Sequence, residues 1–583
     1  MSDVIRLDAW IGRTGQCRDE IGRGSYQLPS PWIKDALEIG YVTMPRKLSI
    51  IIGDVNKTYV WIRIVKNSEK IRIGYPVIIF DYRYGEYIAG IIRAMGYDVE
   101  DPDLYDRQII PHQPLTSELI QFNDTLFLEL SPLYGVEPYC TLKKVGEEIQ
   151  KESVNFAPHI RAPAFIPPTK IIYSILGVPD TGVPYGVIIV GSDLLVDPMT
   201  KTFVPYYMSI PVLFEHELVI GSTGKGKTVK CKNDIYLFLR ATNGSVIVFD
   251  LHGEYSEIAD DPLSDVTPPD IEFKIWKDMG VFPKSIKDVI IWRWTRALKE
   301  VDSDSNVKYF TIKFEEIPPR ALQYYLPALS PQGYVVLPKL VRIFKQEYKG
   351  EKTFRNFYDW LNIMYFDSSI ISNKTRDALL RRLAPLLEEE IFDVDGLDDI
   401  IPEEILIPGR VSIFDLSHIT NNTIRRIIVL HVLRKISEIK LRDSKGRYPP
   451  TFILIDEAHN YFPKHIYDND EKNYIERAIN LVDRICKEGR KFKLRIEFST
   501  QSPEDLHPSV IKTVNTITFF GVNPVQASIL NKSMELPVSI TEIMNLPTRR
   551  AIVYSRSNAD IPIKILIPWP LLKHKISKYV TPQ

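Results

Sequence analysis

The residues best suited to chemistry lie in one short glycine-rich segment, 221–228, which reads GSTGKGKT. It follows the apolar run LVI (218–220) and precedes a helical pattern. Glycines in such a loop let successive backbone N–H groups wrap a phosphate chain, and the N-terminus of the next helix adds positive charge. The spacing predicts a nucleotide-phosphate site formed by Gly221, Ser222, Thr223, Gly224, Lys225, Gly226, Lys227, Thr228 and Val229.

Two side chains of this segment have predicted roles of their own. We expect Lys227 to bridge the β- and γ-phosphates of ATP, and the Thr228 hydroxyl to hold Mg²⁺. ATP and Mg²⁺ are therefore the expected cofactors. A chance glycine loop is the alternative, and the position of the segment between a strand and a helix argues against it.

A second apolar run ends in two acids. FILIDEAH (452–459) predicts a buried strand with Asp456 and Glu457 at its tip. We expect Asp456 to hold the metal together with Thr228, and Glu457 to orient or deprotonate the attacking water. The tetrapeptide DEAH also occurs in superfamily-2 helicases, but their arginine-rich H-R-x-G-R-x-G-R segment does not follow here. Two adjacent acids favour hydrolysis over nucleotide binding alone.

These motifs need a parallel sheet to bring them together. LVI and SVIVFD (245–250) flank a helical pattern and predict a βαβ unit, and strand–helix alternation resumes near residue 410. Between them, patterns such as TRDALLRRLAPLLEEE predict a helical insertion. Towards the N-terminus, short β-branched and aromatic runs such as LSIIIGDV and DTLFLEL (124–130) predict a small β-barrel.

The predicted fold class is α/β, with a RecA-like P-loop ATPase core, a helical insertion and a preceding small N-terminal β-barrel. The predicted boundaries are 1–45 for an N-terminal extension, 46–165 for the barrel, 166–205 for a proline-rich connector, 206–256 for the first part of the core, 257–402 for the helical insertion, 403–565 for the second part of the core and 566–583 for a C-terminal tail.

Composition limits the remaining possibilities. A length of 583 residues suits two or three domains, and a net charge of −1 gives no overall attraction to nucleic acid. Cys17, Cys140, Cys231 and Cys486 form no C-x-x-C pair, which argues against a zinc site and a disulfide-stapled secreted fold. Apolar runs too short for a bilayer and a start without a signal pattern predict a cytoplasmic protein without membrane insertion.

Further segments narrow the group of P-loop proteins. They are DLHGEY (250–255), EAHNYFP (457–463), CKEGRKF (486–492), STQSP (499–503), the dipeptide NT (515–516) and LPTRRAIV (546–553). In kind, order and spacing they resemble the signatures of HerA-type ATPases, which belong to the HerA/FtsK group of ring-shaped DNA motors. The resemblance extends from about residue 210 to 565, and the N-terminal β region is similar in kind to that family's HAS barrel.

The resemblance implies roles for four more residues. Gln501 would sense the γ-phosphate or position water, and Arg490 would reach the ATP of a neighbouring subunit as an arginine finger. Asp250 and Glu254 would contact water or the metal shell in the crevice at the carboxyl ends of the strands.

The sequence departs from the family pattern at two places. The family's Arg after the sensor Gln is Ser502 here. The usual Gly-Glu near the end of the core is replaced by Arg549-Arg550, which introduces two alternative arginine fingers.

The resemblance also implies partners. HerA-type subunits form a homo-hexamer around double-stranded DNA and act with a NurA-type nuclease in DNA end processing and repair. Candidates for a basic pore lining are Arg484, Lys487, Arg490, Lys491, Lys493 and Arg495. Two other functions stay open: a soluble pump-type ATPase of the conjugation/secretion branch acting on protein or DNA at a membrane complex, and a nucleotide switch without turnover.

Overall fold

The computed structural model describes residues 16–18, 25–27, 31–45, 48–52, 58–66, 71–98, 132–146, 148–197, 199–295, 306–326, 329–363, 371–465, 469–528 and 540–574. The chain divides into two compact units. The first comprises residues 1–180 and 188–204, and the second comprises 181–187 and 205–583. Strand β11 (Val183–Val190) begins in the second unit and continues into the first. Each unit is described by itself.

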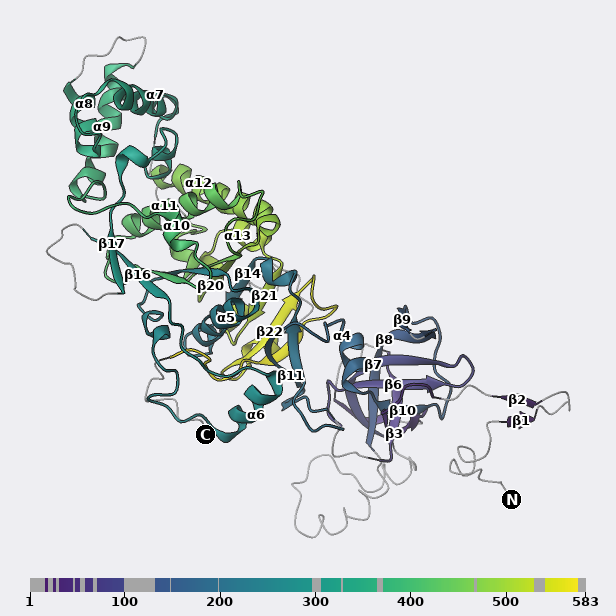
Figure 1. The fold of residues 1–583 in the computed structure, drawn as a ribbon. Coiled ribbons are helices and arrows are strands. Elements are labelled where there is room, and N and C mark those ends of the chain that lie inside the picture. Colours follow the sequence, from purple (N-terminus) through teal and green to yellow (C-terminus); the bar gives the residue numbers. More distant parts are fainter. Residues whose placement is uncertain are drawn as a thin grey trace, which may run out of the picture. The chain divides into compact units, whose positions relative to one another are not determined.

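The first unit is a closed antiparallel β-barrel, drawn in purple to blue in Figure 1. Going round it, the order is β7-β6-β10-β3-β5-β8, and β8 pairs back with β7. These strands are β3 (Leu37–Val42), β5 (Val60–Ile64), β6 (Pro76–Asp81), β7 (Glu86–Asp98), β8 (Pro132–Val145) and β10 (Pro163–Ile166). Closure leaves no sheet edge within the ring, and apolar side chains from Ile39, Ile62, Val77 and Val136 fill its interior.

The barrel has further elements at its margins. β4 (Leu48–Ile52) pairs with β7, and β9 (Glu148–Glu152) pairs with β8. A separate hairpin joins β1 (Gln16–Arg18) to β2 (Ser25–Gln27), and α4 (Thr169–Leu176) follows β10. The expected extension, 1–45, contains β3, which is one of the barrel strands, so the barrel starts earlier than residue 46. The expected strand at 124–130 lies outside the described residues.

The second unit contains the expected parallel sheet. Eight parallel strands follow the order β21-β14-β20-β19-β15-β18-β16-β17. Their bounds are β14 (Glu217–Ile220), β15 (Ser245–Asp250), β16 (Val289–Trp294), β17 (Val307–Phe310), β18 (Val411–Asp415), β19 (Thr451–Ile455), β20 (Leu494–Thr500) and β21 (Thr516–Phe519). Every residue of β14, β15, β19 and β20 is buried, as expected for strands covered by helices on both faces.

Antiparallel strands extend the sheet beyond β21. β22 (Arg550–Ser555) pairs with β21, and β23 (Ile563–Leu566) pairs with β22. β11 follows β23 in the strand order, and β13 (Pro205–Met208) pairs with β11. The mixed α/β class and the N-terminal barrel therefore agree with the sequence-based prediction.

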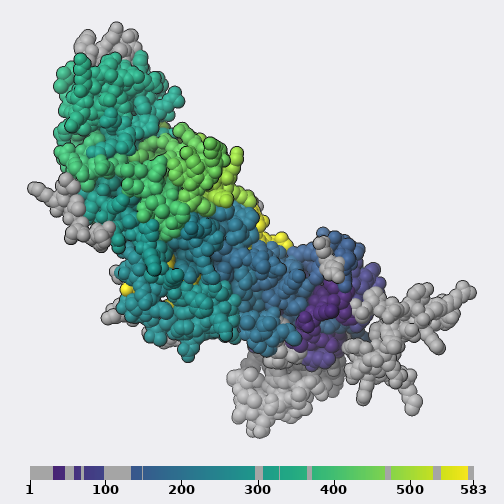
Figure 2. Space-filling view, viewed as in Figure 1, coloured from purple at the N-terminus to yellow at the C-terminus, as the bar shows by residue number. Residues whose placement is uncertain are grey.

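The region expected to be a helical insertion, 257–402, is not wholly helical. It contains α6 (Asp270–Met279), α7 (Pro331–Glu347), α8 (Phe354–Ile363), α9 (Asn373–Glu388) and the short α10 (Pro402–Ile405). It also contributes β16 and β17, which lengthen the parallel sheet. Helices α7 to α9 pack together around Phe314, Phe344 and Phe357, and form one lobe of the second unit (Figures 1 and 2).

The second unit also contains the long helices α5 (Lys227–Thr242), α11 (Asn422–Lys440) and α12 (Asn469–Glu488) and the short helix α13 (Pro508–Thr513). The expected tail is anchored to α5. Asn233 accepts a hydrogen bond from the Leu571 N–H at 2.8 Å and donates to the Pro568 carbonyl at 3.2 Å. None of the helices in the described ranges is long and apolar enough to cross a membrane.

Candidate functional site

The glycine-rich loop connects β14 to α5, as predicted. Gly224 and Gly226 have φ angles of 76° and 106°, which favour glycine. Gly226 is the N-cap of α5, so Lys227 is the first residue of that helix. The loop therefore presents backbone N–H groups together with the positive end of a 16-residue helix, an arrangement suited to phosphate.

Backbone groups of residues that come much later in the sequence hold the loop. The Ser222 N–H donates to the Gly521 carbonyl at 3.0 Å, and Lys225 Nζ donates to the Leu546 carbonyl at 3.2 Å. The Arg549 N–H donates to the Lys225 carbonyl at 2.8 Å. The shape of the loop thus depends on residues about 300 positions later in the sequence.

Lys227, Glu457 and Gln501 form a polar cluster at the loop. The Lys227 ammonium lies 2.5 Å from Glu457 Oε1, and both side chains are about 5% exposed. Gln501 donates twice to Glu457, from its backbone N–H at 3.0 Å and from Nε2 at 2.7 Å. The Thr223 hydroxyl donates to Gln501 Oε1 at 2.5 Å. Three separate strand ends, those of β14, β19 and β20, therefore place their polar residues together.

The two adjacent acids have opposite electrostatic environments. Burial, together with the nearby carboxylates of Glu457 and Asp250, raises the pKa of Asp456 to about 7 against the opposing charge of Lys227. Burial also opposes ionisation of Glu457, but the charge of Lys227 and the hydrogen bonds from Lys227 and Gln501 hold the pKa of Glu457 below its usual value. Two adjacent carboxyls are thus prepared for different roles.

The donor set fits a magnesium nucleotide. A buried carboxyl such as Asp456 resists ionisation unless a cation is near, and Mg²⁺ prefers oxygen ligands of the kind that Asp456 and the Thr228 hydroxyl provide. The glycine loop has room for the phosphates at Gly224, because no atom of the described residues, apart from its chain neighbours, lies within 4 Å of the place that a Cβ atom would take there. When bound, Mg²⁺ would supply positive charge to the phosphate oxygens.

Asp250 is used by the backbone of the next turn. Its Oδ1 accepts the N–H groups of His252, Gly253 and Glu254 at 3.2, 2.8 and 3.1 Å, and Oδ2 accepts that of Tyr255 at 2.9 Å. The side chain is fully buried, and burial raises its pKa. These contacts make Asp250 a positioning residue for the turn. Glu254, by contrast, is exposed.

The predicted arginine finger lies beside a buried acid of its own chain. Arg490 Nη1 is 2.8 Å from Glu215 Oε1, with the arginine side chain 55% exposed and the glutamate 1% exposed. Arg490 belongs to the short 3₁₀ turn Gly489–Phe492, which follows α12. Its exposure leaves it able to reach another chain.

One member of the proposed basic pore lining is not at the surface. Arg495 is 1% exposed and lies on β20, inside the core, so the expectation that it contacts DNA is wrong. Arg484 and Lys487 are mostly exposed and pair along α12 with Glu488 and Asp483. The run of cations in the sequence does not form one surface, because the chain enters the buried strand β20 at Leu494.

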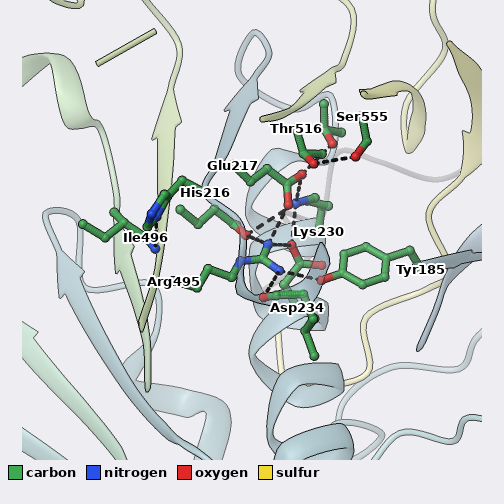
Figure 3. A network of polar contacts seen from close by, with 12 residues as sticks. Tyr185, His216, Glu217, Lys230, Asp234, Arg495, Ile496, Thr516 and Ser555 are labelled. Atoms are coloured by element: carbon green, nitrogen blue, oxygen red, sulfur yellow. Dashed lines mark hydrogen bonds and ion pairs between the residues drawn. The ribbon is translucent and has the colours of Figure 1, made fainter. Parts of the chain in front are cut away.

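Arg495 instead belongs to a buried ion network that was not predicted (Figure 3). Its Nη2 lies 2.6 Å from both Glu217 Oε2 and Glu497 Oε2, and its Nη1 donates to the Tyr185 hydroxyl at 2.9 Å. Lys230 contacts Glu217 at 2.5 Å.

Lys230 also pairs with Asp234 one helical turn further along α5. Burial raises the pKa of Asp234 well above its usual value. Three carboxyl side chains and two cations thus make up the network. It ties the first turns of α5 to β14 and β20, the strands that lead into the glycine loop and Gln501. The sequence feature that indicates this network is the presence of single charged residues, Glu217, Arg495 and Glu497, in the otherwise apolar strands β14 and β20.

Comparison with known proteins supports the P-loop assignment. A family model described as "Helicase HerA, central domain" matches residues 193–436. This part of the chain is similar to the central domain of HerA helicases. A DNA double-strand break repair helicase HerA of Sulfurisphaera tokodaii is 24% identical over 363 residues, which are 59% of this chain and 63% of that relative. A probable helicase of Methanocaldococcus jannaschii is 30% identical over 193 residues, covering 32% and 33% of the two chains. The HerA-type match thus spans less than two thirds of the relatives' own length.

Solved structures give weaker likenesses. VirB4 of Thermoanaerobacter pseudethanolicus matches with a TM-score of 0.43 and 13% identity, over 69% of this chain and 98% of that one. The plasmid coupling protein TrwB in complex with ADP and Mg²⁺ matches with a TM-score of 0.42 and 15% identity, over 67% and 98%.

Proposed function

We propose that the protein is an ATP-hydrolysing motor of HerA type that moves double-stranded DNA. The observation that carries the proposal is the cluster at the glycine loop, where Lys227, Glu457 and Gln501 come together beside Asp456. The names of the HerA relatives supply the DNA part of the proposal.

The cluster suits phosphoryl transfer from ATP to water. The loop N–H groups and Lys227 would bind the phosphates, with Thr228 and Asp456 holding Mg²⁺. Once the Lys227 ammonium turns to the phosphates, Glu457 loses its cation and becomes free to accept a proton from water. Gln501, bonded to both Glu457 and Thr223, would report the presence of the γ-phosphate to β20.

The finer proposal is a homo-hexamer that encloses the duplex and acts with a NurA-type nuclease in DNA end processing. A ring fits a finger that acts on the neighbouring subunit, because each hydrolysis event then depends on two chains. The support is the resemblance of 250–255, 457–463 and 486–492 to HerA signatures, together with an exposed Arg490.

Steady-state ATP hydrolysis at low salt, with and without saturating linear duplex DNA, tests the motor. We expect the duplex to stimulate turnover several-fold, and Lys227→Ala to remove turnover in both conditions. Stimulation also falls steeply with salt if phosphate contacts carry the binding. Turnover that is indifferent to DNA would contradict the translocase and favour the pump-type ATPase of the conjugation/secretion branch.

A further inference from the structure

The two sides of the glycine loop differ in chemistry. Glu457 and Gln501 lie at the ends of β19 and β20, on one side of β14, while β21 and β22 lie on the other side. A nucleotide with its γ-phosphate beside Glu457 runs from there across the N-terminus of α5. Its ribose and base therefore lie towards the β21–β22 side.

Arg549 is in direct contact with the loop on that side. A Cβ atom added to Gly226 would lie 3.1 Å from Arg549 Cα and 3.3 Å from its Cγ. Arg549 itself has a φ of 64°, an uncommon backbone for a non-glycine residue. Strained positions persist where the surroundings hold them, and they gather at ligand sites.

The Arg549 side chain is held against a tryptophan from the C-terminal tail. Its guanidinium lies 5.2 Å from the centre of the Trp569 ring, and its Nη2 donates to Glu272 Oε1 at 2.6 Å. Glu272 Oε2 accepts a hydrogen bond from the backbone N–H of Trp569 at 3.0 Å. The Arg549 side chain is 19% exposed, and Trp569 is half-buried.

The guanidinium has donor capacity to spare. Arg549 Nη1 is buried and has no hydrogen-bond partner among the residues that the structure describes. A ribose hydroxyl or a purine ring nitrogen is an acceptor that suits this N–H group. The planar guanidinium and the indole also suit stacking with a purine.

We propose that Arg549 and Trp569 form the wall of the nucleotide site that receives the ribose and purine base, within the same chain. The proposal rests on the ATP site proposed above and specifies its base-side half. It also assigns Arg549 a role other than an arginine finger, because Glu272 and Trp569 of its own chain hold the guanidinium.

Calorimetric titration of the full chain tests the wall by separating base binding from phosphate binding. The probes are ATPγS, which carries ribose and base, and inorganic tripolyphosphate, which carries neither. Arg549→Gly removes the side chain and suits the positive φ. We expect it to weaken ATPγS binding about tenfold, the size typical of one lost base stack. Tripolyphosphate affinity should stay within about twofold of the wild type. Trp569→Leu should act in the same direction.

Arg556→Ala is the matched control, since Arg556 is an exposed arginine directly after β22, whereas Arg549 lies directly before it. This variant should bind both probes as the wild type does. If Arg549→Gly melts early, Arg549→Lys keeps a cation for Glu272 and should still weaken ATPγS selectively. Equal losses of both probes, or no loss of either, would overturn the wall. So would normal binding with slow turnover, which indicates a finger. A wild type that binds neither probe would instead refute the ATP site itself.

Discussion

At the scale of single residues, Lys227 and Glu457 form a buried ion pair, which ATP would break in the proposed cycle. Each residue has a second partner in the proposed cycle: the phosphates for Lys227 and water for Glu457. The pair therefore opposes ATP binding, and its loss should affect the two steps in opposite directions.

Glu457→Gln tests this. Because glutamine carries no charge and is a poor proton acceptor, we expect turnover to fall at least about a hundredfold. ATPγS should bind as tightly as in the wild type or more tightly, because Lys227 is no longer neutralised. The checks are steady-state hydrolysis and calorimetric titration. Weaker ATPγS binding in this variant would contradict the proposed exchange of partners, and Lys227→Ala serves as the blank.

Asp250 and Glu254 form a second matched pair of variants. Asp250→Ala leaves four backbone N–H groups of the turn without their acceptor, so we expect a loss of about 2–4 kcal/mol in the free energy of unfolding. Glu254→Ala, at an exposed site, should change stability by less than about 0.5 kcal/mol. Chemical denaturation measures both. A large drop in turnover for Glu254→Ala at unchanged stability would support the catalytic role that the family resemblance implies.

At the scale of elements, the start of β14 is held by β20 and by the end of α12. His216 accepts the Ile496 N–H at Nδ1, 2.9 Å away, and its Nε2 lies 3.0 Å from the Cys486 carbonyl. These contacts fix a neutral ring that donates from Nε2. Burial is the main reason why the pKa of His216 is lowered to about 4.

This histidine makes stability depend on pH. An unfolded chain protonates it below about 6.5, whereas the folded chain resists protonation down to about 4. The folded state should therefore lose up to about 3 kcal/mol from this group as the pH falls from 6.5 to 4, and none of it above 7. His216→Asn keeps an acceptor for Ile496 without a titrating ring. Urea unfolding from pH 7 to 4.5 should give a shallower loss in this variant, and an equal slope would contradict the assignment.

The elements also show what the sequence could and could not predict. Continuous apolar runs before GSTGKGKT and DEAH identify β14 and β19, because strands buried on both faces are apolar over most of their length. β16 and β17 were missed, since six-residue and four-residue strands lie between long helical patterns that dominate any local window.

At the site, local motifs identified the loop and the acids. They could not reveal Trp569, Glu272 or the ion network around Lys230, because those contacts join residues from distant parts of the sequence. Charge alone is misleading for Arg495, which is buried on β20, although the cations before it, Lys487, Arg490, Lys491 and Lys493, are exposed.

At the scale of the whole molecule, residues of two neighbouring chains form each ATP site in the proposed ring. Arg490→Ala should reduce turnover by about a thousandfold or more if its guanidinium acts on the neighbouring ATP. Mixing Arg490→Ala chains with Lys227→Ala chains should restore part of the activity. The restored sites pair an intact loop on one chain with an intact Arg490 on the next.

Hydrolysis assays over a series of mixing ratios measure this rescue. Arg484→Ala removes an exposed cation of α12 and is the control, with turnover expected to stay near the wild-type level. Arg490→Lys keeps a cation beside Glu215 and separates a structural loss from a catalytic one. A mixture as inactive as its parts would place the arginine's action within its own chain.

The strand order also has a consequence for folding during synthesis on the ribosome. β14 pairs with β20 and β21, whose residues are made more than 270 positions later, and Trp569 comes later still. The nascent chain thus exposes the apolar β14 and an unshaped glycine loop while more than 270 further residues are made, and such unpaired strands are prone to aggregation. A ribosome that stalls before residue 494 would release a chain unable to bind nucleotide, so ATP can protect only finished molecules.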